Sequence, residues 1–171
     1  MTIAAELGYA FKPANPFQRL MQAMVSSRPG AWLFSKLLPT LDTAVGRLTG
    51  GRHSVPGLLA GLPVIDVTTT GRKSGLRRTT HLISIPVGDT LALLGTNFGQ
   101  ASTPAWVYNL EADPRATVTY RNRSLDVVAR PATPSEFDEV MANSAGIYGG
   151  YRKYRQRVTG RRIRIFVLEP A

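Results

Sequence analysis

A succession of short β-branched and aliphatic runs constrains the fold of this 171-residue chain more than any other feature. The runs are Val64–Thr70, Thr79–Pro86, Leu91–Thr96, Ala116–Tyr120, Ser124–Arg130 and Arg162–Leu168. Such runs predict strands, and the stretches Val87–Thr90 and Arg121–Arg123 are short enough to close hairpins. Because most strands are joined by short turns, we expect a mainly β fold in which about six antiparallel strands form a barrel-like sheet with helices inserted.

The first 55 residues predict a helical arm ahead of the β-rich domain, which we place at residues 56–171. Asn15 can cap a helix that runs to about Ser27, and Pro16 suits its first position. The apolar residues that recur on one face of this helix are Phe17, Leu20, Met21, Met24 and Val25. A second helical piece is predicted from Ala31 to Leu48, broken near Pro39. An amphipathic helix usually covers a core, but this arm is apolar enough to face a membrane as well.

Helices are also predicted between the strands. Thr103 and Pro104 suit the cap and the first position of a helix that runs to about Asp113. The stretch Thr133-Pro134-Ser135-Glu136 is a capping-box pattern, so a further helix should begin there and reach about Ala145. A short helical turn carrying tyrosines is expected next.

The charge balance predicts an anionic partner. The chain has 21 Lys plus Arg against 11 Asp plus Glu, a net charge of +10. Nucleic acid, a membrane surface and a polyanionic small molecule all satisfy that balance. The absence of cysteine excludes disulfides and thiolate metal sites, and two histidines with scattered carboxylates predict no metal site. Neither a signal peptide nor a long apolar run is present, so we expect a cytoplasmic protein that can lie on a membrane surface.

The cations concentrate in two places, the stretch TTTGRKSGLRRTT from Thr68 to Thr80 and the stretch from Arg152 to Arg164. Gly71 and Gly75 would free the backbone of a tight turn to direct its amides at an anion, while the arginines grip it. The cations of the first stretch are Arg72, Lys73, Arg77 and Arg78. An ordinary basic turn explains the pattern equally well. The first stretch is not a nucleotide phosphate loop, because that pattern requires glycine directly before the lysine and Arg72 stands before Lys73-Ser74.

Three further groups are candidates for a site. Asn97-Phe98-Gly99-Gln100 lies between a strand end and a helix start and could hold a polar group, although a plain loop is the simpler interpretation. Trp106 and Asn109 share a helix face, where a core anchor and a satisfied rim amide would be expected. The phenols of Tyr148, Tyr151 and Tyr154 suit a pocket for an aromatic or lipid-like ligand, a base-stacking surface, or a ridge with one buried member.

The chain lacks a nucleophile elbow, a metal cluster and a paired acid and base. An anion-binding loop beside aromatic residues is then typical of a protein whose cofactor supplies the reactivity.

Several motifs occur in a fixed order between about Leu62 and Pro170. They are Thr68-Thr69-Thr70-Gly71-Arg72-Lys73-Ser74-Gly75 with Arg78-Thr79, Asn97 with Gly99, Pro104-x-Trp106-x-x-Asn109-Leu110-x-Ala112-x-Pro114, the tyrosines near Tyr148, and Val167-Leu168-Glu169-Pro170. In these motifs the sequence resembles the deazaflavin-dependent nitroreductase family, flavin/deazaflavin oxidoreductases of the split β-barrel fold, which is FMN-binding-like. His81 and Phe98 depart from the residues that many members carry.

The resemblance implies that coenzyme F420 is the cofactor, with FMN as the alternative. The coenzyme's tail carries a phosphodiester and glutamyl carboxylates, which would explain the cationic stretch. The positions that match the family's tail-binding residues are Arg72, Lys73, Ser74, Gly75 and Arg78. Those expected around the phosphate and the ring are Thr79, Thr80, Asn97, Phe98, Gly99, Trp106 and Asn109. The tyrosines that match substrate-pocket positions, where one could supply a proton, are Tyr148, Tyr151 and Tyr154.

The resemblance therefore predicts an enzyme that transfers a hydride from reduced deazaflavin to an electron-poor acceptor. Activated alkenes, quinones, nitro compounds and unsaturated lipids are the acceptor classes considered, and the apolar arm favours a lipophilic one. A carrier that binds the cofactor without turnover is the first alternative. A nucleic-acid-binding protein is the second, although no recognised nucleic-acid motif is present.

Overall fold

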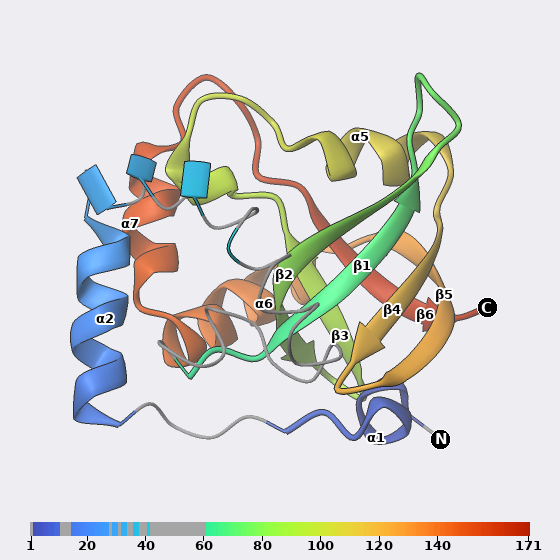
Figure 1. Ribbon diagram of the computed structural model, residues 1–171, viewed down its shortest axis with the longest axis horizontal. Helices are drawn as coiled ribbons and strands as arrows, with labels where there is room; N and C mark the ends of the chain where they lie inside the picture. The colour runs from blue at the N-terminus through green and yellow to red at the C-terminus, as the bar shows by residue number, and fades with distance from the viewer. Residues whose placement is uncertain are drawn as a thin grey trace.

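The computed structural model describes residues 2–10, 15–27, 29–30, 32–33, 36–37, 41 and 61–171 (Figure 1). Its strands form a closed antiparallel barrel in the order β1-β2-β3-β6-β5-β4. They are β1 (Val64–Thr70), β2 (Arg77–Val87), β3 (Thr90–Leu94), β4 (Arg115–Tyr120), β5 (Arg123–Pro131) and β6 (Ile165–Pro170). The predicted antiparallel barrel is confirmed, and its last strand begins at Ile165 rather than Arg162.

Strand alternation decides which side chains fill the barrel. In β1 every second residue is buried, so Ile65, Val67 and Thr69 point inward, each fully shielded from solvent. Both predicted hairpins are present, because β2 pairs with β3 and β4 pairs with β5. β2 pairs with β1 from Arg77 onward, whereas β3 pairs only with the residues from Ser84 to Val87. The first half of β2 therefore lies at an edge of the described sheet.

A short N-terminal helix, α1 (Ile3–Leu7), contributes to the barrel core. Ile3 and Leu7 are 2% and 1% exposed and belong to the same cluster as Val67 and Phe166. The phenol of Tyr9 donates to the carbonyl of Ser84 at 2.9 Å, which fastens the residues that follow the helix. Figure 1 shows α1 at the end of the barrel opposite the loop that joins β1 to β2. The sequence analysis did not predict this helix.

Three helices lie together on one side of the barrel (Figure 1). α6 (Pro134–Ile147) packs on β2, α7 (Gly150–Arg157) packs on α6, and α2 (Pro16–Ser26) packs on α7. Both predicted capping patterns are confirmed, with Asn15 and Gln18 capping α2 and Thr133 and Glu136 capping α6. Most of the second predicted helical piece, 31–48, and the boundary at residues 55 and 56 lie outside the described residues.

Two details of the predicted helices are wrong. In α5 (Ala105–Ala112) Pro104 itself occupies the N-cap position and no side chain caps the helix, so Thr103 does not act as the cap. In α2 the apolar face does not cover a core: Phe17, Leu20 and Met24 are 60%, 59% and 52% exposed. The helix instead contacts α7 through its C-terminal end, where Ser26 is its one buried residue.

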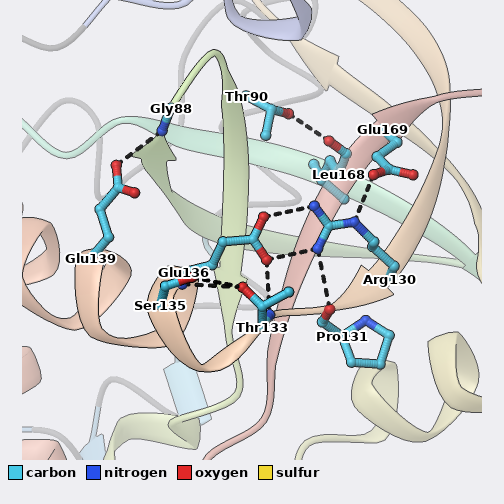
Figure 2. Close-up of polar contacts among 10 residues, drawn as sticks. All are labelled: Gly88, Thr90, Arg130, Pro131, Thr133, Ser135, Glu136, Glu139, Leu168 and Glu169. Atoms are coloured by element: carbon cyan, nitrogen blue, oxygen red, sulfur yellow. Dashed lines mark hydrogen bonds and ion pairs between the residues drawn. The ribbon is translucent and has the colours of Figure 1, made fainter.

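A charged network fastens α6 to the end of the barrel (Figure 2). Arg130 of β5 donates two hydrogen bonds of 2.7 Å to the carboxylate of Glu136 and one of 2.6 Å to Glu169 of β6. The guanidinium of Arg130, followed by the backbone amide of Thr133, lowers the pKa of Glu136 to about 2. The same contacts raise the pKa of Arg130.

We expect Glu136→Gln to lower the free energy of unfolding by about 1–3 kcal/mol at neutral pH, the range for hydrogen bonds to charged groups. Glutamine keeps the capping box, so the substitution removes the ion pair alone. Because the folded-state pKa lies below the ordinary value of 4.5, this stabilisation is present above about pH 4.5 and is lost as the pH falls towards 2. Denaturant unfolding of both proteins from pH 7 to pH 2.5 should show the two curves converging. Glu139→Gln in the same helix is the control, and a difference that persists at low pH would contradict the assignment.

Candidate active site

The loop between β1 and β2 is a tight turn in which the amides of Gly71, Ser74, Gly75 and Leu76 already donate to partners within the turn. The amide of Gly71 donates to the carbonyl of Leu76 at 2.8 Å, and the amides of Ser74 and Gly75 donate to the carbonyl of Gly71. The amide of Leu76 donates to Ser74 Oγ. Gly75 has φ +67°, a conformation that favours glycine. The expectation that backbone amides receive an anion is therefore wrong for these positions, and anion binding falls to the side chains.

Asn109 of α5 ties this loop to the barrel. Its side-chain oxygen accepts a hydrogen bond from the amide of Arg72 at 3.1 Å, and its side-chain nitrogen donates to Thr69 Oγ1 at 3.0 Å. Asn109 is 6% exposed and Trp106 is 4% exposed, with the indole packed edge-on against Phe166. Trp106 is thus a core residue and Asn109 a satisfied polar residue at the rim, as their spacing suggested. Asn109 holds the loop against the barrel through its bonds to Arg72 and Thr69.

We expect Asn109→Ala to reduce the free energy of unfolding by about 1–3 kcal/mol, because the oxygen of the buried Thr69 hydroxyl loses the side-chain N–H that donates to it. Hydrogen exchange should rise at the amide of Arg72 and spread along residues 71–76. Asn143→Ala is the matched control, since Asn143 is exposed and donates to one carbonyl, that of Pro86. Equal protection of the loop in both variants would count against the positioning role of Asn109.

Tyr108 is a site residue that sequence reasoning missed. The guanidinium of Arg72 lies 4.3 Å from the centre of its ring, and that of Arg164 lies 5.9 Å away. Arg164 is in turn paired with Glu111 of the same helix. These contacts hold Arg72 against α5. The position of Tyr108 one residue before Asn109 was the only signal in the sequence, and a helix position alone does not identify a stacking partner.

The remaining cations of the stretch divide between two faces of β2. Arg77 donates to Thr117 on β4, and Thr117 donates to Asp126, so Arg77 belongs to the outer surface of the sheet. Lys73 and Arg78 are exposed and form no ion pair with any residue that the structure describes. A side chain at Gly71 would come within 3.6 Å of Arg78 Nε, which places that guanidinium beside the loop. Lys73 and Arg78 are thus available to a ligand.

The threonines after this cationic pair follow the same alternation. Thr79 shares a hydrogen bond of 2.8 Å with Thr68 of β1, and its side chain lies on the exposed face. Thr80 is half-buried. Both stand on the edge half of β2, which β3 does not cover.

A second group of candidate residues forms the single turn η1 (Asn97–Gly99) after β3. Asn97, Phe98 and Gly99 have φ values of 47°, 54° and 78°, so three successive residues are left-handed. Such a conformation is costly for residues other than glycine and is often found at functional sites. The ring of Phe98 lies edge-on to Tyr154, with centroids 6.2 Å apart. A side chain at Gly99 would come within 3.2 Å of Tyr154 Cα, which explains the need for glycine there.

The three tyrosines form a cluster that is closed in this structure. Tyr148, Tyr151 and Tyr154 are 2%, 5% and 3% exposed, with ring centroids 5.5–6.3 Å apart. The hydroxyls of Tyr148 and Tyr154 are 2.9 Å apart, and Tyr154 donates to the carbonyl of Val25 in α2 at 3.5 Å. Burial raises the pKa of all three phenols, so they stay protonated at neutral pH. All three are buried, not one alone.

Residues 161–164 connect the two groups. Arg161 donates to the carbonyls of Gly95, Thr96 and Gln100, while Arg164 stacks near Tyr108. The cationic loop thus contacts α5, and α5 contacts the segment before β6. That segment binds the residues on either side of η1, and η1 in turn contacts α7. The described part of the chain has no cluster of metal-ligating side chains.

Comparisons with known proteins identify the family of the chain. The sequence profile of the F420H(2)-dependent quinone reductase family matches residues 40–170. The F420H(2)-dependent quinone reductase Rv1261c of Mycobacterium tuberculosis (strain ATCC 25618 / H37Rv) is 32% identical over 125 residues, which cover 68% of this chain and 82% of that protein.

Two solved structures share the fold. An F420-H2 dependent reductase (FDR-A) is 29% identical with a TM-score of 0.57, over 63% of this chain and 94% of its own. A structure described as a domain-swapped dimer is 25% identical with a TM-score of 0.58, over 82% of this chain and 99% of its own. The family profile covers well over half of the sequence, including every strand and both groups of site residues. The chain therefore belongs to the F420H(2)-dependent quinone reductase family.

Proposed function

We propose that this protein uses coenzyme F420 to reduce a quinone or another electron-poor, lipophilic acceptor. The observation that carries the proposal is the pair of exposed cations, Lys73 and Arg78, without an anionic partner among the described residues. A coenzyme tail with a phosphodiester and several carboxylates supplies the negative charges that such a pair would bind. The residues present therefore fit the cofactor that the family uses.

The protein's own residues would bind the coenzyme, orient it towards the acceptor and shield the reaction from water. Lys73 and Arg78 would hold the tail, and the stacked Arg72 and Tyr108 would fix the loop that carries Lys73. Bound F420H2 supplies a hydride, and with one proton a quinone is reduced to a hydroquinone. Catalysis by the chain then consists largely of positioning and exclusion of water.

The buried phenols are candidates for the proton donor. Because burial raises the pKa of Tyr148 and Tyr154, their hydroxyls keep their protons at neutral pH and can donate a hydrogen bond to a reduced oxygen. Their burial means that an acceptor reaches them only when α2 or η1 shifts. Because the hydroxyls of Tyr148 and Tyr154 are hydrogen-bonded to each other, a proton given up by one phenol could be replaced from the other.

The exposed apolar face of α2 supports a lipophilic acceptor taken from a membrane surface. Phe17, Leu20 and Met24 lie three to four residues apart and are all more than half exposed. Further large exposed apolar side chains are Trp32, Leu33, Leu37 and Leu41. The exposed cations Arg152 and Arg155 on neighbouring α7 would favour an anionic lipid surface. No helix in the described part of the chain is long and apolar enough to cross a bilayer.

The decisive experiment is a fluorescence titration of purified protein with oxidised F420 and, separately, with FMN, followed by F420H2 oxidation in the presence of menadione. We expect F420 to bind more tightly than FMN and its oxidation to require menadione. Tighter binding of FMN would assign the chain to flavin chemistry. Tight F420 binding without turnover of menadione or of a nitroaromatic would identify a carrier.

Membrane contact is tested by co-sedimentation with vesicles of phosphatidylcholine with and without phosphatidylglycerol. We expect binding to the anionic vesicles, lost in the double variant Phe17→Ser with Leu20→Ser. Leu76→Ser is the control, because Leu76 is 61% exposed but lies in the β1–β2 loop. If the protein self-associates, does not bind vesicles and becomes monomeric when α2 is substituted, the apolar face of α2 contacts a second copy instead of a membrane.

A further inference from the structure

The segment from Gly95 to Gln100 is bound to one arginine through its backbone. Arg161 Nη1 donates to the carbonyl of Gly95 at 2.9 Å, and Nη2 donates to the carbonyls of Thr96 and Gln100 at 3.0 and 3.1 Å. These three carbonyls bracket the left-handed residues of η1. A planar guanidinium can donate to several acceptors in fixed directions, whereas a lysine ammonium is a single point.

This arginine occupies an unfavourable environment. Its Nε is buried and has no hydrogen-bond partner within the described residues. Burial, followed by the nearby charge of Arg164, lowers the pKa of its guanidinium. No carboxylate of the described residues pairs with it, since Glu111 pairs with Arg164. Burying a cation that is bound only to neutral carbonyls costs free energy. A turn can be closed without that cost, so the arginine calls for a further role.

The segment needs such support because its conformation is strained. Asn97 and Phe98 are both left-handed without being glycine. Among the described residues, the other hydrogen bonds of residues 97–100 are short-range: the amides of Gly99 and Gln100 donate to Thr96 and Asn97, and the Asn97 side chain donates to Ser102. The Thr96 carbonyl accepts from both the Gly99 amide and Arg161, so the arginine reinforces the bond that closes the turn.

We infer that Arg161 is a positioning residue that holds η1 in its ligand-binding conformation, and that it does so without contacting the anionic tail of the cofactor. The inference deepens the proposed function and rests on it for the ligand. Its nitrogens Nη1 and Nη2 already donate three hydrogen bonds to the carbonyls that bracket η1, so we assign this side chain to the backbone of the segment rather than to a phosphate or a carboxylate. Loss of Arg161 should therefore weaken binding of any ligand that touches η1, with or without a tail.

The test uses Arg161→Met and Arg161→Lys in the full chain, with Arg162→Met as the control. Arg162 is the adjacent residue, is exposed, and loses the same charge without touching η1. We expect Arg161→Met to bind F420 and a tailless deazaflavin analogue about tenfold more weakly, by the same factor for both and with no change in salt dependence. Arg161→Lys should recover little of the affinity although it keeps the charge. Arg162→Met should stay within about twofold of the unmodified protein for both ligands.

Hydrogen exchange without any ligand supplies the second measurement. In both Arg161 variants we expect the amides of Gly99 and Gln100 to exchange at least tenfold faster, while amides of β1 and β4 keep their protection. Unchanged exchange at these amides would overturn the inference, and so would a loss of affinity restricted to F420 and sensitive to salt, which would make Arg161 a direct tail contact. Failure of the unmodified protein to bind F420 would overturn the proposed function instead, and the exchange data would still decide whether Arg161 holds η1.

Discussion

The double variant Lys73→Gln with Arg78→Gln is expected to bind F420 about tenfold more weakly than the unmodified protein, while it binds a tailless deazaflavin analogue almost equally well. Both side chains are exposed and have no ion pair among the described residues. Exposed ion pairs contribute about 0.2–1 kcal/mol each, and two such contacts to one tail give about that tenfold effect. The analogue lacks the negative charges that these cations would bind, so its affinity should not change.

The control for this prediction is Arg77→Gln with Arg123→Gln, which removes the same charge elsewhere. Arg77 contacts Thr117 on the outer surface of the sheet, and Arg123 donates to the carbonyl of Glu6 beside α1. Fluorescence titrations at 20 and 200 mM salt should show that only the first pair reduces the salt dependence of F420 binding, because screening acts on exposed charges. Equal losses for the two double variants would mean that net charge, not this loop, attracts the coenzyme. Equal losses for F420 and the tailless analogue would contradict a tail-binding role.

Leu7→Ala is expected to cause the largest loss of stability of any single substitution considered, about 2–5 kcal/mol in the free energy of unfolding. Leu7 is 1% exposed and packs into the barrel core together with Ile3. Truncation leaves a cavity in the close-packed barrel core, and the surrounding side chains relax only partly into it. Denaturant unfolding, monitored through the buried Trp106, measures the effect.

Leu20→Ala in α2 is the matched control. The same side-chain atoms are removed, but Leu20 is 59% exposed, so the expected change is within about 0.5 kcal/mol. A similar loss for both variants would mean that the face of α2 is covered in solution. No loss for Leu7→Ala would mean that α1 does not contribute to the barrel core. Tyr9→Phe should add a smaller effect, because it removes only the hydrogen bond to Ser84.

Local pattern determined the elements of the barrel from the sequence alone. The β-branched and aliphatic runs and the short turns between them identified each strand of the described barrel, since a strand and a tight turn are both local features of the sequence. The cap at Asn15 and the capping box at Thr133 fixed two helix starts for the same reason: a cap is a contact within four residues. The cationic loop and its glycines were also visible, because each motif is contiguous.

Tertiary structure alone decided which faces of these segments are buried and which distant residues they contact. The sequence could not reveal that Leu7 fills the barrel while Leu20 faces solvent, because a helical period shows which residues share a face but not what that face meets. Nor could it separate Arg77 from Arg78, or give Tyr108 and Arg161 their roles, since their partners lie from 36 to 66 residues away along the chain. Short-range patterns determined the strands, the caps and the charged loop of this protein. The assembly of its candidate site depends on long-range contacts, which only the closed barrel brings within reach.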